Sequence, residues 1–197
     1  MRGASFSVNP IPTPRSNIMR TIEINRAPVM TLWAVVVAER LGHAHGEALT
    51  LGRAVTGLNA DSKAKAIGLV SNAQTGRARK EAGPKLGKRP DSVELLGRHV
   101  PVVKTKDGLR ALAKDVAIEP AAVERYLKAR FKESLPLILA AMRKLAASRT
   151  PKALALEAYS LYEKFRPDVP AGEVGWGRAG VLSVETIEAL AGKRSAN

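Results

Sequence analysis

The feature that most constrains this chain is an apolar run, "PVMTLWAVVVA", over residues 28–38. Pro28 suits the first turn of a helix, and apolar residues recur at helical spacing from Val29 to Leu41, where Gly42 ends the pattern. The run is shorter than the roughly 20 residues that an α-helix needs to cross a bilayer. The sequence therefore predicts a helix in the core of a soluble protein and no association with a membrane.

The composition fits one domain. The chain has 197 residues, of which 45% are hydrophobic, which is enough to form one core. Residues 1–18 carry proline, serine and asparagine without periodicity and without the apolar centre of a secretory signal. We expect a disordered N-terminal tail there, a single mostly helical domain at 19–192 and a C-terminal tail at 193–197. Because cysteine is absent, disulfides and thiolate metal sites are excluded, and we expect a cytoplasmic protein.

Capping signals predict further helices along the chain. After the turn "HAHG", a second helix is expected from about Glu47 to Ile67, and Gly52 and Gly57 within it predict a close contact with another helix. From Lys106 onward the pattern is helical. The later helices are expected to begin with a Ser, Thr or Asp cap, or with a proline in the first turn, at Asp107, Pro120, Ser134, Thr150 and Ser183.

One segment shows strand alternation instead. In "SVELLGRHVPVV", apolar residues alternate around Val93 and again around Val102, which predicts two short strands in a hairpin with Pro101 at a sheet edge. The expected fold is therefore mainly α: a bundle of about six helices with one small β-hairpin near 93–104.

Positive charge is concentrated in one part of the chain. The formal net charge is +14 and the isoelectric point is near 10.4. Between Gly76 and Pro90 the only acid is Glu81, and the glycines and prolines there predict a mobile basic loop at 71–91. Such a loop can neutralise the phosphates of a polyanion, although a solvated linker has the same composition. Its six cations are Arg77, Arg79, Lys80, Lys85, Lys88 and Arg89.

A second candidate is the segment "LRALAKDVAIEPAAVERYLKARF" at 109–131. Its spacing is that of two short helices packed together, with Ala117 in the turn, where glycine is usual, and with these residues in the core: Leu112, Val116, Ile118, Val123 and Tyr126. On that spacing the segment resembles the helix-turn-helix DNA-binding motif over about twenty residues. By this resemblance, the base-contacting positions are Glu119, Pro120, Ala121, Ala122, Glu124, Arg125 and Lys128.

The residues at those positions alter the expected contact. Acids and alanines read base edges poorly, and a packed helical hairpin has the same apolar spacing without any DNA. DNA contact is therefore expected from the basic flank of the segment and from phosphates, with low sequence specificity. The flank consists of Arg125, Lys128, Arg130 and Lys132.

Other patterns carry weaker signals. His43 and His45 with Glu47 could offer ligands to zinc, but an exposed turn is the preferred interpretation, and no metal or cofactor is predicted. His99 could act as a general base, but no partner stands at a catalytic spacing. The glycines of "GEVGWGRAG", residues 172–180, lack the phosphate-loop pattern, so its tryptophan is expected to anchor the loop against the helices.

Three functions follow from these observations. We expect first a double-stranded DNA-binding protein, either a regulator or nucleoid-associated, that contacts phosphates through the basic loop and the segment 107–132. The alternative is a helical interaction protein or homodimer without nucleic-acid binding, with its tight interface at Gly52 and Gly57. The second alternative is an enzyme with a site near His99, Arg178 and the loop 168–180, for which no catalytic residue can be assigned.

Overall fold

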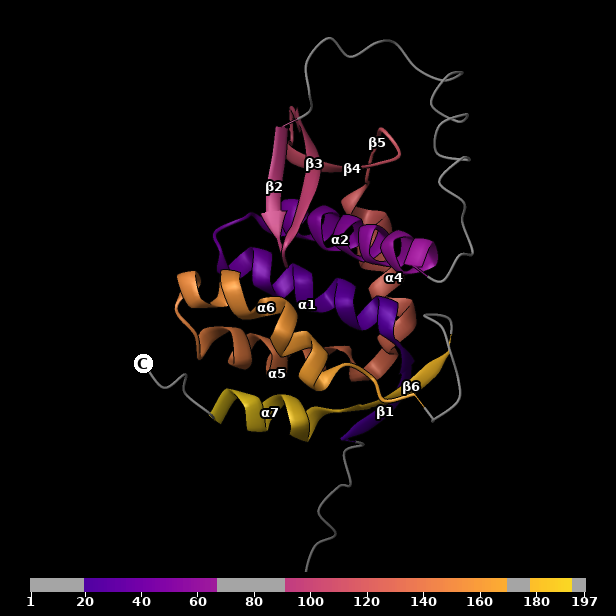
Figure 1. Cartoon of the computed structure of the whole chain (residues 1–197), viewed down its shortest axis with the longest axis vertical. Helices are drawn as coiled ribbons and strands as arrows, with labels where there is room; N and C mark the ends of the chain where they lie inside the picture. The colour runs from indigo at the N-terminus through magenta and orange to yellow at the C-terminus, as the bar shows by residue number, and fades with distance from the viewer. Residues whose placement is uncertain (1–19, 67–90, 170–177, 193–197) are drawn as a thin grey trace, which may run out of the picture.

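The structure is a computed structural model that describes residues 20–66, 91–169 and 178–192 (Figure 1). The tails predicted at 1–18 and 193–197, and residues 71–90 of the predicted basic loop, lie outside the described residues. In chain order the elements are β1 Thr21–Asn25, α1 Arg26–Arg40, α2 His45–Ala66, β2 Asp91–Leu95, β3 Arg98–Thr105, β4 Gly108–Ala113, β5 Val116–Ala117, α4 Pro120–Phe131, a 3₁₀ turn Lys132–Ser134, α5 Leu135–Ala147, α6 Pro151–Phe165, β6 Ala179–Ser183 and α7 Val184–Gly192.

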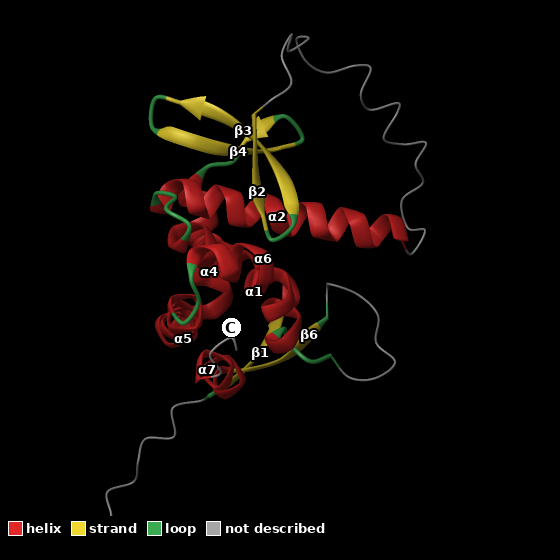
Figure 2. Cartoon of the chain, turned by 60° about the vertical axis from the view of Figure 1, so that its left-hand side comes forward, coloured by secondary structure: helices red, strands yellow, loops and turns green. Residues whose placement is uncertain are grey.

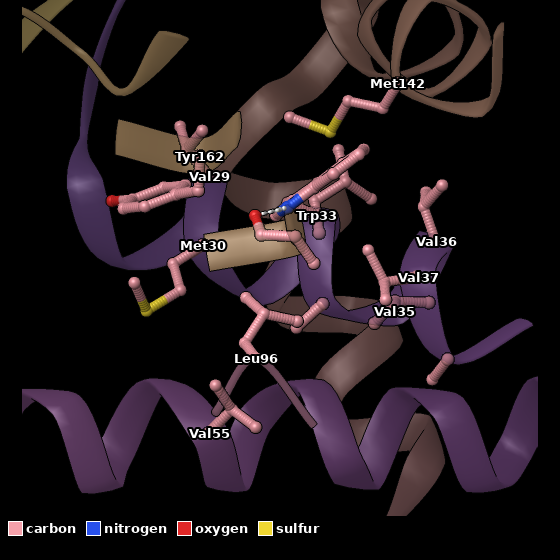
Figure 3. Packing of buried hydrophobic residues seen from close by; sticks show 14 of the residues in the cluster. Val29, Met30, Trp33, Val35, Val36, Val37, Val55, Leu96, Met142 and Tyr162 are labelled. Carbon is pink, nitrogen blue, oxygen red and sulfur yellow. Dashed lines mark hydrogen bonds between the residues drawn. The ribbon is translucent and has the colours of Figure 1, made fainter. Parts of the chain in front are cut away.

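Helix α1 forms the centre of the molecule. Every residue from Pro28 to Ala38 is buried, because α2, α4, α5 and α6 all pack against this helix. The Trp33 indole N–H donates a 2.8 Å hydrogen bond to the Ala158 carbonyl of α6 (Figure 3). The Trp33 ring meets the Phe165 ring edge-on, with 5.3 Å between the ring centroids. The buried helix predicted from the apolar run is confirmed.

Helices α1 and α2 approach closely at Gly52. A Cβ built on Gly52 would lie 2.7 Å from the Thr31 carbonyl oxygen and 2.7 Å from a methyl carbon of Val35. Nearby, the buried hydroxyls of Thr31 and Thr56 form a 2.9 Å hydrogen bond. The close helix contact predicted at Gly52 is confirmed, and it lies within the chain. Gly57 is exposed, and no atom of the described residues lies within 4 Å of a built Cβ, so it makes no such contact with them.

A four-stranded antiparallel sheet, ordered β2-β3-β4-β5, covers α2 on the side away from α1 (Figure 2). Its first hairpin turns at Leu96 and Gly97, which both have positive φ, as type I′ turns require. Leu96 is 3% exposed, so the tip of this hairpin is part of the core (Figure 3). Pro101 pairs with Ser92 of β2, and the β3–β4 ladder starts one residue later, at Val102.

The second sheet joins the two ends of the described chain. β1 pairs antiparallel with β6, and the Val184 N–H at the start of α7 donates to the Arg20 carbonyl at 2.8 Å. This sheet lies at the end of the molecule opposite the four-stranded sheet, beside α7 (Figure 1, Figure 2). The α5, α6 and α7 helices begin within a residue of the positions predicted for them.

The prediction of a mainly α bundle is wrong: the strands of two sheets make the fold mixed α/β. The hairpin predicted near 93–104 is present, but β4 and β5 extend it, and β1–β6 adds a second sheet.

The helix expected from Asp107 is replaced by β4 and β5. Gly108, Lys114 and Asp115 adopt positive φ, which no α-helix contains. The N–H groups of Leu109 and Ala111 donate to side chains of α2, which fixes β4 against that helix.

Candidate nucleic-acid interface

Helix α4 and the first residue after it carry the four predicted DNA contacts that the structure describes. Pro120 occupies its first turn, and Val123, Leu127 and Phe131 recur every four residues to form the buried side. α4 packs with this side against α1 and α2. The predicted contacts are all exposed. Arg125, Lys128 and Arg130 lie on the rest of the helix surface, and Lys132 follows the last residue of the helix.

The exposed cations of α4 differ in their partners. Lys128 forms a 2.7 Å ion pair with Glu124 one turn earlier, and this contact lowers the pKa of the Glu124 carboxyl. No ion pair between described residues involves Arg125, Arg130 or Lys132. Three of the four predicted cations are thus available to an anionic partner.

Of the segment that resembles the helix-turn-helix motif, only the second helix forms, as α4. Residues 109–117 belong to β4 and β5, so the first helix of the resemblance is replaced by a hairpin. Val123 is buried as predicted, whereas Val116 is 68% exposed. Glu119, at the first base-contacting position of the resemblance, forms a 2.7 Å ion pair with Arg110 of β4.

A fifth cation, Arg53 of α2, joins this surface. Its guanidinium carbon lies 5.1 Å from the centroid of the Tyr126 ring, and that of Arg130 lies 5.7 Å from the same ring. Arg53 was not predicted from the sequence, because 73 positions separate it from Tyr126. Its charge, between the apolar residues Leu51 and Val55, is the local signal for an exposed position on α2.

The six predicted contacts of the basic loop lie outside the described residues: Arg77, Arg79, Lys80, Lys85, Lys88 and Arg89. The described chain reaches this loop from α2, which ends at Ala66, and leaves it at the start of β2, Asp91. In the sequence, the loop follows the helix that carries Arg53.

The histidines of the α1–α2 turn pair with carboxylates. His45 Nδ1 lies 2.6 Å from Glu39 Oε1, and His43 Nδ1 lies 3.5 Å from Glu47 Oε2. Glu47 also accepts the Leu109 backbone N–H at 2.9 Å, and this hydrogen bond, followed by the contact with His43, lowers the pKa of the Glu47 carboxyl. Across the parts of the chain that the structure describes, no cluster of three or more His, Asp or Glu side chains could hold a metal ion.

The residues of the enzyme alternative lie apart. His99 is exposed on β3, whereas Asp168 and β6 lie at the opposite end of the molecule (Figure 1). Residues 170–177, including Trp176, are outside the described residues. A hollow between α1, α6 and the β2–β3 turn measures about 160 Å³. Ligand pockets usually enclose about 300–1,000 Å³.

Comparisons with family models, with curated proteins and with solved structures find no match to this chain.

Proposed function

We propose that this protein binds double-stranded DNA through its phosphates, with low sequence specificity. The observation that carries the proposal is the exposed surface of α4 and of Lys132 directly after it, where Arg125, Arg130 and Lys132 have no acidic partner among the described residues. When side-chain cations without an acidic partner neutralise phosphates, the counterions condensed on the DNA are released, and this release favours binding. The net charge of +14 and the six cations of the adjoining basic loop act in the same direction.

The side chains beside these cations favour phosphate contact over base reading. Ala121, Ala122 and Ala129 are exposed on α4 and offer no hydrogen-bonding group, so α4 carries few groups that distinguish base pairs. The Tyr126 ring has arginines beside it, so it provides no open platform on which an unpaired base would stack. Duplex DNA contacted along its backbone fits these properties better than a single strand does.

A DNA-binding role implies a location with the chromosome. None of the helices in the described ranges is long and apolar enough to span a membrane. A chain that lacks cysteine needs no oxidising compartment. The cytoplasm is the compartment that the proposal implies.

Salt-dependent titration of labelled duplex DNA tests the proposal. Each phosphate contact contributes about 0.9 to the slope of log affinity against log salt, so we expect a steep slope for the wild type. The double variant R125Q/K132Q should reduce that slope by about 1.8. Affinities for unrelated duplexes should differ far less than the about 10³-fold that marks specific binding.

A matched control is available at the other end of the molecule. Lys144 and Lys152 are exposed near the turn between α5 and α6, away from α4 (Figure 1). K144Q/K152Q removes the same charge and should leave the slope unchanged. If the wild type does not bind duplex even at low salt, the proposal is wrong, and a dimer mass in light scattering would then favour the interaction protein.

A further inference from the structure

The ring of Tyr126 brings two arginines from different helices together. Tyr126 is half-buried on the flank of α4 that faces α2. Arg53 of α2 and Arg130 of α4 place their guanidinium carbons 5.1 and 5.7 Å from the ring centroid, within the range of a cation–π contact. Burial raises the pKa of the Tyr126 hydroxyl, so the ring remains uncharged at neutral pH.

This arrangement favours an anion. Neither arginine forms an ion pair with another described residue, although both are exposed. Two like charges held near one ring repel each other, and phosphate groups that pair with them reduce that repulsion. The planar guanidinium offers several N–H donors in a fixed fork that fits phosphate oxygens, and contact with the ring restricts its orientation before the ligand arrives.

The surface of α2 beside Arg53 is open. Gly57 follows Arg53 by one helical turn on the same face, and a Cβ there would meet nothing within 4 Å. The acid on this face is Asp61, a further turn along and exposed. A nucleic-acid backbone can therefore reach Arg53 without displacing a side chain at Gly57.

We infer that Arg53 and Arg130, oriented by Tyr126, form a phosphate-binding pair that contacts the backbone of one DNA strand. The inference depends on the proposed function for the identity of its ligand. It adds that α2 contributes to the interface and that the interface is preorganised by an aromatic side chain. Arg53 and Arg130 contact phosphate directly, whereas Tyr126 is a positioning residue.

Salt-dependent titration of duplex DNA tests the two arginines. R53Q and R130Q should each reduce the slope of log affinity against log salt by about 0.9, and the double variant by about 1.8. K152Q, which removes one charge near the start of α6, is the control and should have no effect. A slope for R53Q equal to that of the wild type would overturn the inference and leave the proposed function standing.

Tyr126 has its own readout because its substitution changes no charge. Y126L should keep the slope within about 0.3 of the wild type and yet weaken binding about 3- to 10-fold, since guanidinium orientation lost in the free protein must be regained on binding. Y126F keeps the ring and should bind like the wild type. Thermal unfolding of both variants shows whether they fold. If Y126L and Y126F bind duplex DNA with equal affinity, Tyr126 does not position the two arginines.

A second measurement separates this inference from the proposed function. The side-chain Nε–H resonances of Arg53 and Arg130 are followed by NMR while the wild type is titrated with inorganic pyrophosphate. Both should move together, with a smaller effect of sulfate. If duplex DNA does not bind but both resonances respond, the phosphate pair stands and the DNA proposal fails. If neither responds to pyrophosphate or to DNA, the pair does not exist.

Discussion

Gly52 and Gly57 stand five residues apart on α2 and look equivalent in the sequence, yet their environments are opposite. Gly52 lies against the α1 backbone, where a Cβ would come within 2.7 Å of the Thr31 carbonyl. Gly57 points to solvent, with free space around it. Helix propensity alone predicts that each glycine makes α2 less stable than alanine would. Only the contact with α1 shows that Gly52 is the one of the two that has no room for a larger side chain.

The two glycines give a matched pair of stability predictions. G52A should destabilise the protein by about 1–3 kcal/mol, because neither the Thr31 carbonyl nor the Val35 side chain can withdraw far within the α1–α2 contact. G57A should stabilise it by about 0.5–1 kcal/mol, since alanine favours a helix interior and has room here. Urea unfolding of both variants measures these changes. Destabilisation by G57A would contradict this prediction and show that a neighbouring group occupies the space beside Gly57.

Glu47 predicts how stability depends on pH. The Leu109 N–H and His43 lower the pKa of its carboxyl in the folded protein, so the folded state holds the ionised form more strongly than the unfolded chain does. This stabilisation is present above the ordinary glutamate pKa of about 4.3 and is lost as the pH falls towards the lower folded pKa. E47Q should destabilise the protein at pH 7 and lose less stability than the wild type between pH 5 and 3. Urea midpoints across that range test it, with exposed E133Q as the control.

At the scale of elements, the sequence predicted helices better than strands. Helices α4, α5, α6 and α7 begin at signals that are local: Pro120, Ser134, Thr150 and Ser183. In α6, for example, the Thr150 hydroxyl accepts the Ala153 N–H, which is a contact within one helical turn. β6 pairs with β1, which lies far away in the chain, and no local signal encodes that pairing. β4 pairs with β3 directly before it, but its attachment to α2 through the Leu109 and Ala111 N–H groups depends on residues far away in the chain.

The attachment of β4 to α2 makes Thr50 a critical residue. Its buried hydroxyl accepts the Ala111 N–H at 3.1 Å and donates to the Glu47 carbonyl at 2.9 Å. T50V keeps the shape but leaves the buried Ala111 N–H without this acceptor, which should cost about 1–3 kcal/mol. T50S keeps the hydroxyl and should cost less. Urea unfolding gives both values, and faster amide exchange at Ala111 in T50V would locate the loss in β4.

At the scale of the molecule, part of the candidate interface was predictable and part was not. The cations of α4 follow from one helical pattern, and their exposure agrees with it. Arg53 joins them only because α2 and α4 pack across each other, which depends on the fold. The sequence therefore located the cations of α4. That Arg53 lies beside them depends on the contact between α2 and α4.

Substitutions in the basic loop should change DNA binding without changing the stability of the folded core. α2 and β2 are held by contacts with α1, α4 and β3, so replacing all six loop cations by glutamine should not lower the unfolding temperature. Removing like charges from a chain of net charge +14 also reduces self-repulsion. The same variant should reduce the salt slope of duplex binding by about 5, against about 1.8 for R125Q/K132Q. A loop variant that melts like the wild type and binds duplex with an unchanged slope would show that the loop is a solvated linker, and that the surface of α2 and α4 accounts for binding alone.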